Sequence, residues 1–458
     1  MLPTDAAIAA NRFGYGARPG DLARFGGHAR DALLAQLRGP APLLPDALAS
    51  SRELLSQVTA AREQKREGDK AAPAAAVGKV LREIYGPAYI ADAGARTRAA
   101  ITSPNDFLER LVQFWSNHFA VSVDKVAVLG LAGPMEREAI RPHVLGNFTD
   151  MLLAVEKHPA MLLYLDNPQS IGPNSTAAQM AERRGRDRGL NENLGREILE
   201  LHTLGVDGGY TQKDVRALAA MITGWSLGGE SGRLRGGESG AFYFREAFHE
   251  PGPQQLLGKR YGEAGMEQGE TALRDLALNP HTAQHLATKL ARHFVADEPP
   301  AALVDRMARA YLDSRGHLPA TYRALLESPQ SWRASLSKYK TPADYIHSAY
   351  RALQLPFAGR PMELRLFEQL GQRPFQPGSP AGYPDRGADW DGSSALLKRL
   401  EWAREQGQKL GTTRDAGEVA EAVLGGTLTA DTRTAISRAQ DGAQALTLLL
   451  AAPEFMRR

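Results

Sequence analysis

The sequence contains no cysteine among its 458 residues. Disulfide bonds, iron–sulfur clusters, thiolate zinc sites and cysteine nucleophiles are therefore excluded. The remaining metal ligands are poorly spaced, because His281 and His285 lie one helical turn apart but lack the glutamate of a zinc-protease motif. We therefore expect no structural metal and no cofactor, while a catalytic ion at the polar site described below stays open as an alternative.

Long apolar runs and a charge excess are also missing. No stretch reaches the roughly 18 apolar residues of a membrane-spanning helix, so no span is predicted. The opening MLPTDAAIAANRFGYG has neither a basic region nor a long apolar stretch, so we expect no signal peptide. A cytoplasmic location is the expectation, with a periplasmic or exported protein as the alternative. Lys and Arg number 55 against 52 Asp and Glu, and the run RRGRDRG at 183–189 is typical of a solvated loop, so no nucleic-acid partner is expected.

Helical periodicity dominates what is present. Hydrophobic residues make up 43% of the chain and charged residues 23%, values typical of a globular protein with a large core. Apolar residues recur three and four positions apart in most segments, which predicts helices. Thr211 followed by Asp214 predicts a capping box, and Ser103-Pro104 predicts the start of the helix that carries Trp115.

We predict a mainly α protein, a single helical domain over residues 1–458 with long ordered loops. At most a small β-hairpin or short sheet is expected, with AFYFREAFH at 241–249 as a strand and QQLLGKRY at 254–261 as its candidate partner. The proline- and glycine-rich segment 372–392 is too long for an ordinary connection, and loops of this length are commonly functional. Its three aromatic residues predict an ordered loop packed on the body.

The densest group of polar residues lies in NENLGREILELHTLG, residues 191–205. Leucines and an isoleucine alternate with the polar residues, which predicts a largely buried helix. A buried carboxylate must be paired or protonated, so we expect partners from elsewhere in the chain. The polar residues of interest on this helix form a row that consists of Asn193, Arg196, Glu197, Glu200 and His202.

Further polar and aromatic residues flank other predicted helices. FWSNHFAVS at 114–122 and YLDNPQS at 164–170 are the expected sources of amide and imidazole partners for the buried row. The residues singled out in these and later segments are Asn117, His118, Asp166, Asn167, Trp225 and His249.

Two hypotheses explain these residues. In the first, the protein is an enzyme of the hydrolase type with a buried Glu/Arg/Asn/His pocket. Its predicted catalytic residues are Glu197, Glu200, His118 and Arg196. Its predicted substrate-binding residues are Asn117, Asp166, Asn167, Asn193, His202, Trp225 and His249.

In the second hypothesis, the protein is a noncatalytic binding or assembly protein. The same residues then form a structural network, with Arg196 and Glu200 as an ion pair one turn apart. A lone buried histidine such as His118 is often only hydrogen-bonded to a backbone carbonyl. The alternative catalytic ion would be held by His118, Glu197, Glu200 or His202.

Several separated segments together resemble the bacterial family named domain of unknown function 1800 (DUF1800). They include NRFGYGARPGDL, FWSNHFAVS, NENLGREILELHTLGVDGGYTQKDVRALAAMITGW, NPHTAQHLATKLARHFVADEPP and GYPDRGADW. The segments follow one another over about the whole chain, but none of them is the signature of a known reaction. The resemblance implies a candidate partner, a sulfatase-like protein of the DUF1501 family, because similar proteins are often encoded beside one.

Overall fold

The computed structural model describes residues 4–44, 47–68, 74–183, 189–229 and 235–458. The protein is mainly α-helical, with 62% helix, which confirms the predicted fold class. Residues 184–188, which form most of the predicted arginine-rich loop, lie outside the described part of the chain. Among the described helices, none is both long enough and apolar enough to cross a membrane.

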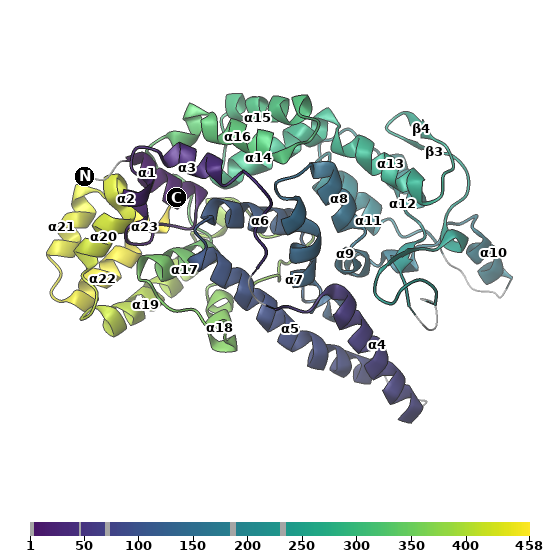
Figure 1. The fold of residues 1–458 in the computed structure, drawn as a ribbon, viewed down its shortest axis with the longest axis horizontal. Helices are drawn as coiled ribbons and strands as arrows, with labels where there is room; N and C mark the ends of the chain where they lie inside the picture. Colours follow the sequence, from purple (N-terminus) through teal and green to yellow (C-terminus); the bar gives the residue numbers. More distant parts are fainter. Residues whose placement is uncertain (1–3, 45–46, 69–73, 184–188, 230–234) are drawn as a thin grey trace.

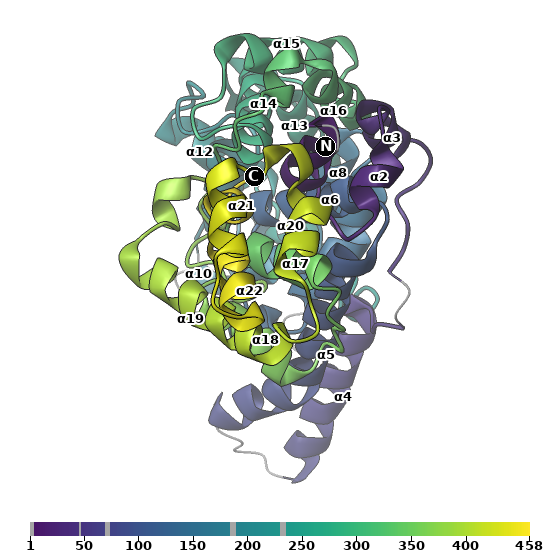
Figure 2. The same ribbon diagram turned by 90° about the vertical axis from the view of Figure 1, so that its left-hand side faces the viewer.

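The first half of the described chain forms twelve numbered α-helices that run from the purple to the blue-green part of the ribbon (Figure 1). They are α1 (Thr4–Ile8), α2 (Asp21–Phe25), α3 (Ala29–Ala35), α4 (Ser51–Gly68), α5 (Ala74–Thr102), α6 (Asp106–His118), α7 (Ala132–Met135), α8 (Phe148–Glu156), α9 (Pro159–Tyr164), α10 (Thr176–Glu182), α11 (Asn193–Glu197) and α12 (Gln212–Met221). Helix α4 and the start of α5 project together away from the body in two perpendicular views (Figures 1 and 2).

The second half closes the body around α6. Its helices are α13 (Met266–Ala277), α14 (Pro280–Phe294), α15 (Ala301–Asp313), α16 (Leu318–Glu327), α17 (Pro342–Ala352), α18 (Pro361–Gln369), α19 (Ser393–Leu410), α20 (Ala416–Leu424), α21 (Ala430–Ser437), α22 (Gly442–Ala451) and α23 (Pro453–Met456). The yellow C-terminal helices lie beside the purple N-terminal ones in Figure 1, so residues far apart in sequence meet there.

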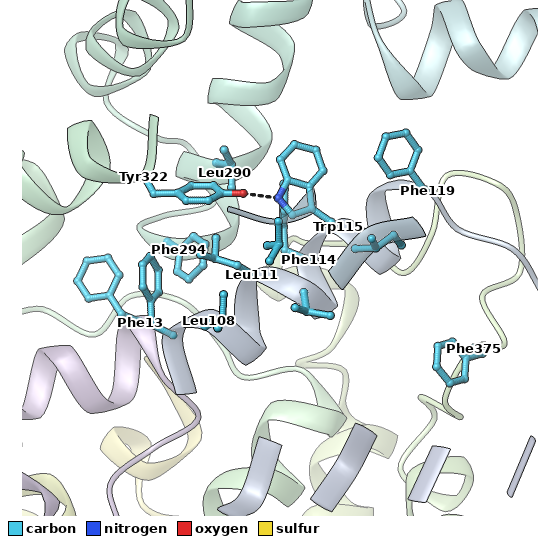
Figure 3. Packing of buried hydrophobic residues seen from close by; sticks show 14 of the residues in the cluster. Phe13, Leu108, Leu111, Phe114, Trp115, Phe119, Leu290, Phe294, Tyr322 and Phe375 are labelled. Atoms are coloured by element: carbon cyan, nitrogen blue, oxygen red, sulfur yellow. Dashed lines mark hydrogen bonds between the residues drawn. The ribbon is translucent and has the colours of Figure 1, made fainter. Parts of the chain in front are cut away.

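Buried apolar side chains form one contiguous cluster that includes residues from Ala6 to Met456. Helix α6 lies near its centre, and Figure 3 shows Leu111 and Trp115 of this helix among aromatic residues of other segments. The indole Nε1 of Trp115 donates a hydrogen bond of 2.6 Å to the hydroxyl of Tyr322. Because a buried indole N–H needs a partner, this contact orients α16 on α6. The single-domain organisation stays a prediction.

The strands pair differently from the sequence prediction. Strand β2 (Phe242–Phe244) pairs antiparallel with β1 (Trp225–Leu227), and β3 (Gln254–Leu256) forms a separate hairpin with β4 (Lys259–Tyr261). The predicted pairing of 241–249 with 254–261 is therefore wrong. The short turn at Leu257-Gly258 brings the two halves of the second segment together, and both of its residues have positive φ angles.

Helix caps were predicted with mixed success. The capping box between Thr211 and Asp214 is present and opens α12. The predicted start of α6 at Ser103-Pro104 is wrong, because the helix begins at Asp106 with Asn105 at its N-cap. The hydroxyl of Ser103 instead accepts a hydrogen bond from the Asn105 amide at 3.1 Å, which forms a local turn before the helix.

The last residues of the chain lie in the body as an extended segment. The amide of Lys340 donates to the carbonyl of Met456 at 2.9 Å, and the amide of Arg458 donates to Lys338 at 2.8 Å. This pairing places the side chain of Arg458 between α14 and α17, where it is 1% exposed. The same region contains the cavity described below.

Candidate functional site

The stretch 191–205 forms a largely buried helix, as predicted. It consists of α11 followed by a π-helical turn, η6 (Ile198–His202). Leu194, Ile198 and Leu199 are fully buried. The stretch ends at Gly205, whose φ of 85° favours glycine and where a Cβ atom would lie only 2.7 Å from Nδ1 of His285.

The predicted pairing of Arg196 with Glu200 is wrong. Arg196 donates instead to Glu192 at 3.2 Å and to Gln212 at 2.9 Å, and its side chain is 40% exposed. Glu200 accepts a hydrogen bond of 3.3 Å from the Tyr210 hydroxyl. The arginine lies on the side of the helix that faces Glu192 and solvent, so it is not a buried charge awaiting Glu200.

The buried end of the row contains a carboxylate–histidine pair that the sequence did not reveal. Nδ1 of His202 lies 2.7 Å from Oε1 of Glu156, and the two side chains are 1% and 0% exposed. Nε2 of His118 lies 3.1 Å from the carbonyl oxygen of His202. His118 therefore makes the backbone contact that the structural hypothesis predicts, while it joins α6 to η6.

Glu197 is the member of the row whose surroundings best suit acid–base chemistry. Its side chain is half-buried on α11, and burial raises the pKa of its carboxyl above the ordinary value, with the nearby Glu200 carboxylate adding to the effect. The neighbouring His202 acts in the opposite direction. Asn193 is exposed on the same helix.

Of the predicted partner side chains, only His118 contacts this row among the described residues, through the His202 carbonyl. Asn117 pairs with the backbone of Tyr383, donating to its carbonyl at 2.9 Å and accepting from its amide at 2.7 Å. Asp166 accepts from Lys125 at 2.7 Å, and the amide of Asn167 donates to the carbonyls of Ile222 and Trp225. The expected pairing of the row with these side chains is wrong.

His249 lies beside the segment that leads into Trp225. Trp225 is fully buried at the start of β1. Nδ1 of His249 lies 3.1 Å from the carbonyl oxygen of Thr223, two residues before Trp225. These contacts anchor the strand pair beside α12.

A cavity of about 80 Å³ lies between α6, α14, α17 and the loop 372–385. The loop is packed on the body as predicted, with Phe375 and Trp390 buried. Gly382 in this loop has a φ of 83°, and a Cβ there would lie 2.3 Å from the Asn117 carbonyl. Glycine thus permits the close approach that closes the cavity. Its polar lining includes Tyr15, Arg96, Gln113, Asn117, His293, Asp344, His347, Gln372, Arg373, Tyr383 and Asp385.

One histidine–carboxylate pair lines this cavity. Nδ1 of His293 on α14 lies 2.9 Å from Oδ1 of Asp385 in the loop. Burial alone would raise the pKa of Asp385, but the hydrogen bond and charge of His293 lower it to about 2, so the carboxyl is ionised. The ring nitrogen facing an ionised carboxylate is the protonated one, which leaves Nε2 as the acceptor. Within the described residues, Nε2 has no hydrogen-bond partner.

His347 on α17 is the second histidine of the cavity. It is 2% exposed, and neither ring nitrogen has a hydrogen-bond partner in the part of the chain that the structure describes. Its ring meets the Tyr15 ring edge-on at a centroid distance of 4.8 Å. A buried, unpaired imidazole is costly unless a ligand or water satisfies it.

Sequence reasoning missed His293, His347 and Asp385. Each lies in a segment that follows helical or loop periodicity, and His293 and Asp385 are separated by 92 positions. The available signal was the aromatic-rich loop 372–392, which was predicted to be ordered and is the segment that carries Asp385.

Acidification is expected to destabilise the protein as the pH falls below about 6.5. Burial lowers the pKa of His347 to about 3 and that of His293 to about 4, from an ordinary value of 6.5. The unfolded chain therefore binds more protons than the fold below pH 6.5, so stability is complete above that pH and lost as pH falls toward 4. Each histidine contributes a slope of up to about 1.4 kcal/mol per pH unit.

Melting temperatures measured from about pH 8 to about pH 4 test this linkage. His347→Phe should flatten the curve, whereas His281→Gln, which alters an exposed histidine on α14, should leave it unchanged. A curve with the same slope in the His347→Phe variant would contradict the assignment.

Among the described residues, no three His, Asp or Glu side chains are grouped to hold a metal ion. The DUF1800 family, described as proteins of unknown function, matches residues 8–457 of the chain. No curated protein and no solved structure matches the chain.

Proposed function

The chain belongs to the DUF1800 family, whose function is unknown, and we propose that it is a hydrolase-type enzyme that activates water at His293. The observation that supports this proposal is the His293–Asp385 pair in the wall of the cavity. A neutral imidazole oriented by an ionised carboxylate is the arrangement that general-base catalysis uses. The two side chains are mostly buried, at 14% and 17% exposed, where electrostatic interactions are stronger than in water.

The reaction proceeds by direct attack of water. Nε2 of His293 takes a proton from a water molecule as the water oxygen bonds to the electrophilic centre of the substrate. The bond to the leaving group then breaks, and His293 returns the proton to that group. Water is the proposed nucleophile because, among the described residues, no hydroxyl side chain lies within hydrogen-bond distance of Nε2 of His293.

Two contacts hold the base in place. The guanidinium of Arg458 donates to the carbonyl oxygen of His293, and the ammonium group of Lys338 donates to the carbonyl oxygen of Asp385. Tyr15 and Asn117 line the same cavity and are the proposed substrate-orienting residues, although Asn117 also anchors the loop through Tyr383.

His293→Gln is expected to lower any hydrolytic activity by about a hundredfold or more, because the substitution removes the base. The purified full chain is assayed against activated acetate, phosphate and sulfate esters. His281→Gln is the matched control on the same helix, where the histidine is exposed. Undiminished turnover in the His293→Gln variant would contradict the proposal.

Glu197 is the alternative base from the sequence hypothesis. Its raised pKa and half-buried position support that role. Loss of activity in Glu197→Gln, together with full activity in His293→Gln, would indicate that the active site lies at the 191–205 helix. Glu200, His118 and Arg196 would then be its other catalytic residues.

A noncatalytic role in assembly with a sulfatase-like DUF1501 protein is the second candidate. The paired state of Arg196 and the buried Glu156–His202 pair support it, since these contacts use the predicted catalytic row for structure. A pairwise pull-down with the DUF1501 protein is the direct experiment. Complex formation combined with no turnover of any ester would favour this candidate over the enzyme.

A further inference from the structure

Two arginine side chains from distant segments line the cavity and lie against aromatic rings. Arg96 of α5 holds its guanidinium carbon 4.6 Å from the centroid of the Phe375 ring. Arg373 in the loop lies 5.2 Å from the centroid of Tyr89, and its Nε donates to the Tyr89 hydroxyl at 3.1 Å. These contacts with aromatic rings help to position both guanidinium groups without using their terminal nitrogens.

The terminal nitrogens of these arginines are available to a ligand. A guanidinium carries five N–H donors, and for Arg373 only the Nε donor has a hydrogen-bond partner among the described residues. Nε of Arg96 lies 2.9 Å from Oε2 of Glu136, and within the described chain its two terminal nitrogens have no hydrogen-bond partner. Paired terminal N–H groups match the oxygens of a carboxylate, phosphate or sulfate.

The carboxylates of the cavity do not neutralise Arg373. Asp344 is in ion-pair contact with Arg110 and Arg458, and Asp385 is engaged by His293. Within the described residues, Arg373 has no carboxylate within ion-pair distance. A partly buried positive charge without a paired anion favours a negatively charged ligand.

His347 supplies an independent sign that the cavity binds a ligand. Its imidazole is 2% exposed and lines the same cavity as the two arginines. Its unpaired ring nitrogens offer one donor and one acceptor to a polar group in that space. The volume of about 80 Å³ is several times the roughly 10–15 Å³ that one water molecule needs in the same measure, so the cavity holds a group of a few heavy atoms.

We propose that the cavity binds the anionic group of a small substrate, a carboxylate, phosphate or sulfate, through Arg373 and Arg96, with His347 as a further hydrogen-bond partner. The inference deepens the proposed function, because it assigns a substrate class to the same cavity. Anion binding does not itself require the base, so the two proposals can fail separately.

Calorimetric titration of the full chain with inorganic phosphate, sulfate and acetate tests the inference, with acetamide as the neutral probe. We expect at least one anion to bind and acetamide not to bind. Arg373→Met keeps the length of the side chain but removes its charge, and should weaken anion binding by about tenfold or more. Preference for acetate over phosphate and sulfate would identify a carboxylate substrate, and the reverse preference a phosphoryl or sulfuryl group.

Arg365→Met is the matched control, because Arg365 is exposed on the neighbouring helix α18. It should bind the anion as the wild type does. Should Arg373→Met fail to fold, as its melting curve would show, the wild-type titration still decides. Absence of anion binding in the wild type overturns the inference, as does equal affinity in a folded Arg373→Met variant.

The His293→Gln variant separates this inference from the proposed function. Retained anion affinity with lost activity supports both. Anion binding in a fully active His293→Gln variant contradicts only the proposed base, and loss of activity without any anion binding in the wild type contradicts only the substrate class.

Discussion

Replacing Asp344 by asparagine is expected to lower the free energy of unfolding by about 3–5 kcal/mol. Oδ2 of Asp344 lies 2.8 Å from Nη2 of Arg110 and 2.9 Å from Nε of Arg458, and both arginine side chains are 1% exposed. The neutral amide would leave two buried guanidinium charges without their shared partner. Breaking a buried ion pair costs more than its net value because the remaining charge stays desolvated.

Electrostatics at Asp344 supports the same expectation. Burial alone would raise the pKa of its carboxyl, but Arg110, Arg458 and His293 together lower it well below the ordinary value. A depressed carboxyl pKa means that its stabilising contribution is complete above the unfolded value near 4 and is lost as the pH falls below it.

Urea denaturation at neutral pH measures the effect, and Asp207→Asn, at an exposed position, is the control for removing one negative charge. In a double-mutant cycle, Arg458→Met should cost less in the Asp344→Asn background than in the wild type. A change below about 1 kcal/mol in Asp344→Asn would mean that solvent reaches the arginines, as at a surface pair.

The parts of this fold that the sequence predicted are those governed by local interactions. Helical periodicity and the Thr211–Asp214 capping box act within a few residues, and both predicted real elements. The pairing of β2 with β1 was missed because the two strands are joined by a long glycine-rich segment, whose length does not determine a register.

The same difference between local and long-range interactions explains which parts of the candidate site could be predicted. Burial of the 191–205 helix was evident from its leucines, but the partners of its polar residues were not. Glu192, one turn before Arg196, competes for the arginine on the solvent side, so the sequence allowed two pairings of similar spacing. His293 and Asp385 meet only because the loop 372–385 folds back over α14, which no local pattern indicates.

Glu156→Ala is expected to destabilise the protein by about 3 kcal/mol or more, whereas Glu200→Ala should cost less than about 1 kcal/mol. The carboxylate of Glu156 is fully buried against His202, so its removal leaves a buried imidazole nitrogen without a partner and opens space in the core. Glu200 is half-buried, and its hydrogen bond from Tyr210 is long at 3.3 Å.

Chemical denaturation of the two alanine variants side by side tests this contrast, with equal helix propensity changes in both. A buried Arg196–Glu200 pair would instead make Glu200→Ala cost about 3 kcal/mol or more, because Arg196 would be left buried without its partner. In the structure, Arg196 retains its contacts with Glu192 and Gln212 when Glu200 is removed. The residue whose removal leaves a buried partner, His202, without its hydrogen bond is Glu156 of α8. Equal destabilisation by both substitutions would contradict this assignment and would mean that Glu200 stabilises the fold as much as Glu156 does.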